Sequence, residues 1–142
     1  MFGTDFEIAS LDDAKKIART FAENLLLRDG AVVLLCGEMG AGKTTLVSHI
    51  LEAMGIGVRA TSPTFTLINQ YCDNIYHVDL WRINGNDVTS LGLDEILLGE
   101  NLVFIEWSEK LPNSYWQQYD QVIKIKIEKI GPSKRKVYYE EI

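Results

Sequence analysis

The sequence predicts an α/β protein whose central sheet is parallel and carries antiparallel strands at its sides. Two apolar runs of strand length, Ala31–Cys36 and 102–105, lack alternation, as expected of parallel strands covered on both faces. A glycine-rich segment and a helical stripe follow the first run, which is the start of an α/β unit. Residues 122–128 instead alternate apolar and charged side chains, which indicates an antiparallel edge strand.

The remaining elements are predicted from local patterns. Ser10 is placed as the N-cap of a helix over 11–25, with Asp12 and Asp13 in its first turn, where negative charge suits the helix dipole. Strands are expected over 6–9, 65–71 and 75–80, helices over 43–54 and 93–98, a turn at 73–74, a loop over 84–92, and a terminal strand over 137–142 that pairs through 131–133.

Length and composition indicate one ordinary globular domain. The chain has 142 residues, 46% of them hydrophobic, with no repeat or linker-like stretch, so we expect a single domain over 1–142. No apolar run approaches the ~20 residues that a membrane span requires, and no secretory signal is present. Cys36 and Cys72 are expected to be buried, reduced thiols. A cytoplasmic protein is therefore predicted.

The charge balance argues against a protein that binds nucleic acid tightly without a partner. The formal net charge is −6, whereas phosphate contacts normally demand a basic face. The basic cluster at 134–136 follows a Gly-Pro-Ser turn and is interpreted as a solvated turn. Nucleic acid, if it figures in the function, is expected to be reached through a partner.

One segment satisfies the pattern G-x-x-x-x-G-K-[ST] in full, which is a phosphate-binding loop. Its glycines allow a nest of inward N–H groups, and the following helix offers its positive end to the same anion. Lys43 supplies a charge for the β and γ phosphates, and the Thr44 hydroxyl can ligate magnesium. The predicted nucleotide-binding residues are Gly37, Glu38, Met39, Gly40, Ala41, Gly42, Lys43, Thr44 and Thr45.

A phosphate loop needs an acid for the metal and for water, and two acids follow predicted strands. Glu106 ends the run 102–105, and Asp79 ends the less apolar run 76–78. At the carboxyl end of a strand in an α/β sheet, either carboxylate would face the ligand crevice. We expect both near the site, and the sequence does not divide the metal and water roles between them.

Other residues have two interpretations each. Thr61, Ser62, Pro63 and Thr64 lie where many P-loop proteins keep a switch that senses the γ phosphate, although a proline-stiffened turn fits equally. His77 shares a strand face with Asp79 and is interpreted as a packed strand histidine. Trp81, Trp107 and Trp116 are interpreted as core or interface anchors rather than as base-stacking groups.

Two missing features narrow the class of nucleotide-binding protein. There is no N-K-x-D stretch for guanine recognition, which argues against a GTPase. Small-molecule kinases usually carry an arginine-bearing lid, and after the loop only Arg59, Arg82 and Arg135 are present.

Taken together, four segments resemble the TsaE (YjeE) family in order and spacing. They are 37–46, the Thr-Ser-Pro-Thr-Phe-Thr-Leu of 61–67, the Tyr-His-Val-Asp-Leu-Trp-Arg of 76–82 and the Ile-Glu-Trp-Ser-Glu of 105–109. The resemblance covers nearly the whole chain, and Trp81 departs from it by standing where tyrosine is more usual.

The resemblance implies a P-loop NTPase-like three-layer fold and a bacterial ATPase required for threonylcarbamoyladenosine (t6A) modification of tRNA. It implies ATP with Mg²⁺, with Glu106 beside Thr44 in the metal site, Asp79 needed for hydrolysis, and residues 61–64 as a switch-like segment. The implied partners are the TsaD transferase and its companion TsaB. A free-standing small-metabolite phosphotransferase and a nucleotide-binding module without hydrolysis remain as alternatives.

Overall fold

The computed structural model describes residues 3–61, 67–83 and 92–142. Within them the chain forms a seven-stranded sheet of order β1-β7-β6-β2-β5-β4-β3. The strands are β1 (Gly3–Ile8), β2 (Ala31–Cys36), β3 (Ile68–Cys72), β4 (Ile75–Asp79), β5 (Leu102–Glu106), β6 (Val122–Lys129) and β7 (Arg135–Glu141). The helices are α1 (Leu11–Leu26), α2 (Lys43–Ala53), α3 (Leu93–Leu98) and α4 (Asn113–Gln117), with a 3₁₀ helix η3 (Ser108–Lys110).

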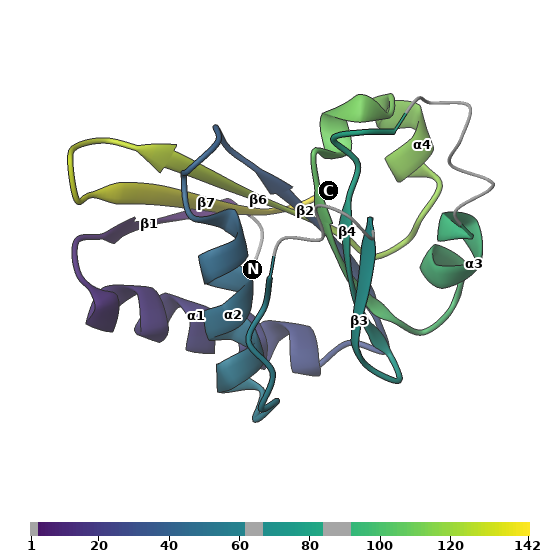
Figure 1. Cartoon of the computed structure of the whole chain (residues 1–142), viewed down its shortest axis with the longest axis horizontal. Helices are drawn as coiled ribbons and strands as arrows, with labels where there is room; N and C mark the ends of the chain where they lie inside the picture. Colours follow the sequence, from purple (N-terminus) through teal and green to yellow (C-terminus); the bar gives the residue numbers. More distant parts are fainter. Residues whose placement is uncertain (1–2, 62–66, 84–91) are drawn as a thin grey trace.

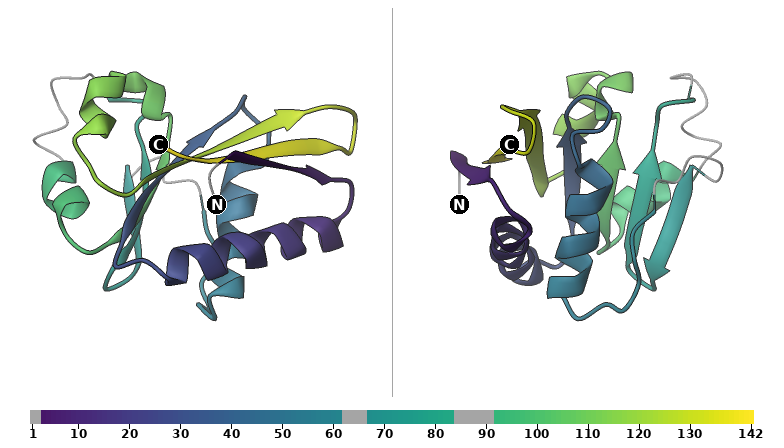
Figure 2. Two further views of the ribbon diagram at one scale, coloured as in Figure 1. Left: turned by 180° about the vertical axis from the view of Figure 1, so that it is seen from behind. Right: turned by 60° about the vertical axis from the view of Figure 1, so that its left-hand side comes forward.

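The predicted fold class is confirmed. Strands β6, β2, β5 and β4 pair in parallel, whereas β7, β1 and β3 join antiparallel at the two sides. Helices α1 and α2 lie on one face of this sheet, and α3 and α4 lie on the other (Figures 1 and 2). The helices therefore supply the two outer layers that a parallel sheet needs.

Each face of the sheet has its own core. On one face, Phe21 of α1 and Ile50 of α2 pack with Val33, Phe104 and other strand residues. On the other face, Leu93 and Trp116 pack with the alternate strand residues, such as Ile105 and Val78.

The predicted antiparallel pairing of 122–128 with the terminal strand is confirmed, but the prediction that 122–128 lies at the edge of the sheet is wrong. Strand β6 is internal: it pairs in parallel with β2 and antiparallel with β7. Its residues Ile123, Ile125 and Ile127 are buried in the core beneath α1, whereas Lys124 and Lys126 point away from that core. The alternation thus reports one uncovered face of the sheet, and it carries no information about the position of the strand within the sheet.

Local signals placed most other elements well. Ser10 caps α1, because its Oγ accepts from the N–H of Asp13 at 3.1 Å. The predicted hairpin of β3 and β4 is present. Strand β1 is longer than predicted, and η3 and α4 were not predicted. Residues 65–66 of the predicted third strand and 84–91 of the predicted loop lie outside the described residues.

The cysteine prediction holds only in part. Both thiols are free, but Cys72 is exposed and Cys36 is half-buried. Burial raises the pKa of the Cys36 thiol, because the apolar surroundings disfavour the thiolate. Within the described parts of the chain, no helix is long and apolar enough to cross a membrane.

Candidate functional site

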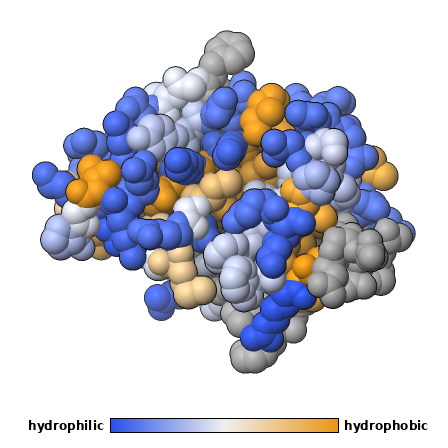
Figure 3. Space-filling view, turned by 90° about the horizontal axis from the view of Figure 1, so that it is seen from above, coloured by the Kyte–Doolittle hydropathy of each residue, from blue (hydrophilic) through white to orange (hydrophobic). Residues whose placement is uncertain are grey.

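The phosphate loop connects the end of β2 to the start of α2, at the edge of the sheet where the parallel strands end. Gly40 and Gly42 have positive φ values of 79° and 105°, so the chain turns through conformations that glycine adopts without strain. Gly37 has φ 152°, and a Cβ there would lie 2.6 Å from the carbonyl oxygen of Ile127. No side chain caps α2, whose first residue is Lys43, which leaves its positive end for an anion. Figure 3 looks down on this edge, where apolar side chains lie among mainly hydrophilic ones.

Lys43 is buried and its side chain turns back across the loop. Its Nζ donates to the carbonyl oxygen of Gly37 at 2.9 Å and lies 4.4 Å from the ring centroid of Trp107. The ammonium group is therefore held at the mouth of the loop by a carbonyl dipole and an aromatic face.

Glu106 occupies the position next to the loop that the sequence predicted for an acid. Thr44 Oγ1 donates to Glu106 Oε2 at 3.1 Å, and His77 Nε2 lies 2.6 Å from the same oxygen. Burial raises the pKa of the Glu106 carboxyl. The bonds from His77 and Thr44 and the charge of Lys43 outweigh it, so the net pKa is lowered. Glu106 is thus ionised at neutral pH.

His77 is one of the site residues that sequence reasoning missed. It was interpreted as a packed strand histidine, yet its fully buried ring lies between Glu106 and Tyr71. Its Nδ1 lies 2.7 Å from the hydroxyl of Tyr71, and that hydroxyl also lies 3.3 Å from the backbone N of Thr61. The available signal was the shared strand face of His77 and Asp79.

Asp79 and Glu106 lie side by side. They are register partners on the parallel strands β4 and β5, so both carboxylates reach the same edge of the sheet, as expected. Asp79 is buried, and its Oδ1 accepts from the backbone N–H of Trp81 at 2.9 Å. Its predicted catalytic role stays a prediction.

Two tryptophans form an aromatic shelf beside the loop. The ring centroids of Trp81 and Trp107 are 4.3 Å apart, and Lys110 Nζ lies 5.0 Å from the Trp81 ring. Trp81 is 48% exposed, so the shelf opens to solvent. Trp116, in contrast, is a core residue whose Nε1 donates to the carbonyl of Ser108.

The predicted switch is described only at its first residue. The backbone of Thr61 contacts Tyr71, and the side-chain amide of Asn69 donates to the Thr61 carbonyl at 3.2 Å. Ser62, Pro63 and Thr64 lie outside the described residues.

The basic cluster at 134–136, interpreted from the sequence as a solvated turn, instead lies at the start of strand β7 and contacts the phosphate loop. Arg135 Nε donates to the carbonyl oxygen of Ala41 at 3.2 Å. A Cβ on Gly40 would lie 3.3 Å from the Nζ of Lys129, which places this second cation against the loop. The hairpin of β6 and β7 therefore adds positive charge beside the predicted phosphate site.

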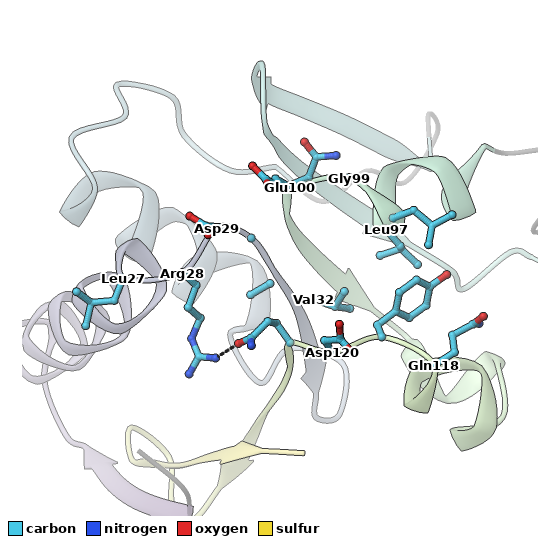
Figure 4. Close-up of a pocket in the computed structure, with 15 residues that line it drawn as sticks. Leu27, Arg28, Asp29, Val32, Leu97, Gly99, Glu100, Gln118 and Asp120 are labelled. Atoms are coloured by element: carbon cyan, nitrogen blue, oxygen red, sulfur yellow. Dashed lines mark hydrogen bonds between the residues drawn. The ribbon is translucent and has the colours of Figure 1, made fainter.

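A cavity of about 630 Å³ lies at the opposite edge of the sheet, where β2 and β5 begin (Figure 4). Its lining includes Asp29, Glu100 and Asp120, and Arg28 there is bonded to Gln121. Three carboxylates disfavour a triphosphate, so the size of this cavity does not make it the nucleotide site. The loop and its acids are the better candidate on chemical grounds.

A glycine loop between a parallel strand and a helix, with lysine and threonine at the helix start and an acid on the adjacent strand, defines the P-loop class of proteins. Comparison with known protein families identifies the family within this class. The family model described as "Threonylcarbamoyl adenosine biosynthesis protein TsaE" matches residues 8–137. The chain belongs to the TsaE family.

The relatives agree with this assignment. A Nostoc protein named tRNA threonylcarbamoyladenosine biosynthesis protein TsaE is 45% identical over 95 residues, which cover 61% of this chain and 57% of that protein. The Bacillus subtilis protein of the same name is 32% identical over 131 residues, covering 90% of this chain and 79% of that protein. A crystal structure of Bacillus subtilis YdiB superposes with a TM-score of 0.71 at 28% identity, covering 96% and 84% of the two chains.

Proposed function

We propose that this protein binds ATP with Mg²⁺ at residues 37–45 and hydrolyses the ATP as an accessory subunit of bacterial t6A modification of tRNA. The observation that carries the proposal is the hydrogen bond from Thr44 Oγ1 to the ionised Glu106, beside the phosphate loop. In P-loop proteins a hydroxyl and a carboxylate in these positions hold the magnesium ion, so Thr44 and Glu106 would hold it here.

The groups at the site suit Mg²⁺. A threonine hydroxyl and a carboxylate are hard oxygen donors, which are the ligands this ion prefers. Glu106 and Thr44 would hold the ion, which would neutralise charge on the transferred phosphoryl group.

The chain's own residues divide the remaining tasks. The backbone N–H groups of the loop and the start of α2 would bind the phosphates, and Lys43 would leave the Gly37 carbonyl to contact the β and γ oxygens. Asp79 ends β4 beside Glu106, which ends β5, and Asp79 would orient the attacking water. Catalysis of this kind needs positioning and charge, and no covalent step on the protein.

The partners follow from the family and from the charge. We propose that the protein acts on a TsaD-like transferase and a TsaB-like companion, and that it meets tRNA only through that complex. The net charge of −6 supports this, because an acidic subunit holds tRNA weakly by itself. The cytoplasm is the proposed location.

The test is ATP turnover by the purified protein, alone and with the purified partner pair. We expect weak hydrolysis alone and a higher rate with the partners. The matched control is Lys43→Ala, which should weaken ATP binding by roughly 10-fold or more and abolish both rates. If the partners leave the rate unchanged while a small acceptor raises it, the protein is a free-standing phosphotransferase. ATP binding without any turnover would leave only a nucleotide-binding module.

A further inference from the structure

A chain of hydrogen bonds crosses the sheet from the end of the segment after α2 to the phosphate loop. It starts at the backbone N of Thr61, passes through the Tyr71 hydroxyl and the His77 ring, and reaches Glu106 Oε2, which also accepts from Thr44. The N···O and O···O distances along it are 3.3, 2.7, 2.6 and 3.1 Å. Strands β3, β4 and β5 each contribute one residue to it.

The protons in this chain have one consistent arrangement with a neutral imidazole. A carboxylate oxygen only accepts, so His77 Nε2 carries a hydrogen and donates to Glu106. His77 Nδ1 is then the acceptor and receives the Tyr71 hydroxyl hydrogen. The Tyr71 oxygen in turn accepts from the N–H of Thr61. Each donor meets an acceptor, which is the condition for burying such groups.

This chain of hydrogen bonds fixes the orientation of the Glu106 carboxylate. The bonds from Thr44 and His77 end on the same oxygen, Oε2, so rotation of the carboxylate would break both. Glu106 is 4% exposed and His77 is 0% exposed, so water offers little replacement for either bond.

The same chain of hydrogen bonds links the orientation of the Glu106 carboxylate to the position of Thr61. The Tyr71 hydroxyl lies 3.3 Å from both the N and the O of the Thr61 peptide groups. A displacement of Thr61 would therefore change the hydrogen bonds of the Tyr71 hydroxyl. The bond from Tyr71 to His77 would change in turn, and with it the bond by which His77 holds Glu106.

We propose that His77 and Tyr71 are positioning residues that hold the Glu106 carboxylate for the magnesium site and make its position depend on Thr61. The proposal rests on the function proposed above, since it concerns the same ATP site. Neither residue touches the reacting atoms; both act through Glu106.

The experiment compares Tyr71→Phe, His77→Ala and His77→Gln with wild type in the full chain. The measurements are kcat for ATP hydrolysis with the partner pair, the Kd for ATP, and the Mg²⁺ concentration giving half-maximal rate. Losing the hydroxyl bond should lower kcat about 2- to 10-fold, and losing the bond to the charged carboxylate about 10- to 100-fold. We expect the half-maximal Mg²⁺ concentration to rise in Tyr71→Phe and in His77→Ala, and the Kd for ATP without Mg²⁺ to stay within about twofold of wild type.

His77→Gln and one additional control variant, Tyr76→Phe, separate positioning from mere packing. His77→Gln supplies an N–H donor near the position of Nε2 and should recover part of the rate lost in His77→Ala. Tyr76→Phe is the matched control, because it removes a hydroxyl from β4 on the opposite face of the sheet. It should leave kcat and the Mg²⁺ dependence unchanged.

The outcomes distinguish this inference from the proposed function. If wild type hydrolyses ATP and Tyr71→Phe and His77→Ala show the wild-type rate and Mg²⁺ dependence, the positioning role is wrong. If wild type shows no turnover, the proposed function is wrong. The inference is then decided by ATP binding: Mg²⁺ should tighten it less in His77→Ala than in wild type, and an equal tightening would overturn the inference.

Discussion

At the scale of single residues, the site is organised around one carboxylate that is kept ionised in a buried place. Glu106 accepts from Thr44 and His77, and these bonds with the charge of Lys43 lower its pKa against the effect of burial. A buried ionised acid is expensive unless it is bonded in this way. The loop, the lysine and the acid therefore depend on one another.

The two acids give the first residue-scale prediction. Glu106→Gln and Asp79→Asn should each lower the ATP hydrolysis rate roughly 100-fold or more, because the charge that holds the metal or orients water is removed. ATP binding, measured by titration, should change far less, since the loop and Lys43 are intact. Normal turnover by both variants would contradict the assigned roles. The exposed Glu109, mutated to Gln, serves as the matched control.

The residue scale also shows where sequence reasoning stopped. Gly37 to Thr45, Asp79 and Glu106 were located from motif and strand-end position alone. His77 was seen to share a face with Asp79, but its bond to Glu106 depends on the parallel pairing of β4 with β5. No spacing along the chain encodes that pairing, because the two residues are 29 positions apart.

At the scale of elements, the phosphate loop is shaped by the strand beside it. Strand β6 passes so close to the start of the loop that residue 37 has no room for a side chain. The core beneath α1 and α2 holds β2 and β6 at that separation.

Gly37→Ala is therefore expected to destabilise the protein. Its Cβ would lie 2.6 Å from a backbone oxygen, and φ is 152°, a conformation that alanine adopts only with strain. The free energy of unfolding should fall by about 2 kcal/mol or more, with a loss of ATP binding as the loop shifts. Chemical denaturation measures the first and titration the second. Gly57→Ala, where nothing lies within 4 Å of the added Cβ, should show neither effect.

At the scale of the whole molecule, stability depends on the core that joins α1 to the antiparallel side of the sheet. Tyr139 of β7 is fully buried, its ring stacks on Phe21 at a centroid distance of 4.7 Å, and its hydroxyl donates to Asn24. Burial raises the pKa of Tyr139 to about 12. The folded protein thus holds this proton more tightly than the unfolded chain, whose tyrosines titrate near 10.

The sign of the pH dependence follows. Below pH ~10 the tyrosine is neutral in both states and its contribution is complete; it falls as pH rises from ~10 through about 12. The loss is on the order of 2 kcal/mol over this window. The measurement is the difference in unfolding free energy between wild type and Tyr139→Phe at several pH values. Groups common to both proteins cancel in it. A difference that stays constant across the window would contradict the prediction.

The sequence by itself determined the local features: the capped first helix, the apolar strands, the loop with its lysine and threonine, and the family to which these motifs belong. These depend on neighbours within a few residues, because caps, turns and glycine conformations are set by short-range sterics and hydrogen bonds. Only the tertiary structure decided that β6 is internal, that His77 supports Glu106, and that Arg135 meets the loop. Those contacts join residues far apart in the chain, and sheet order and the packing of both faces bring them together.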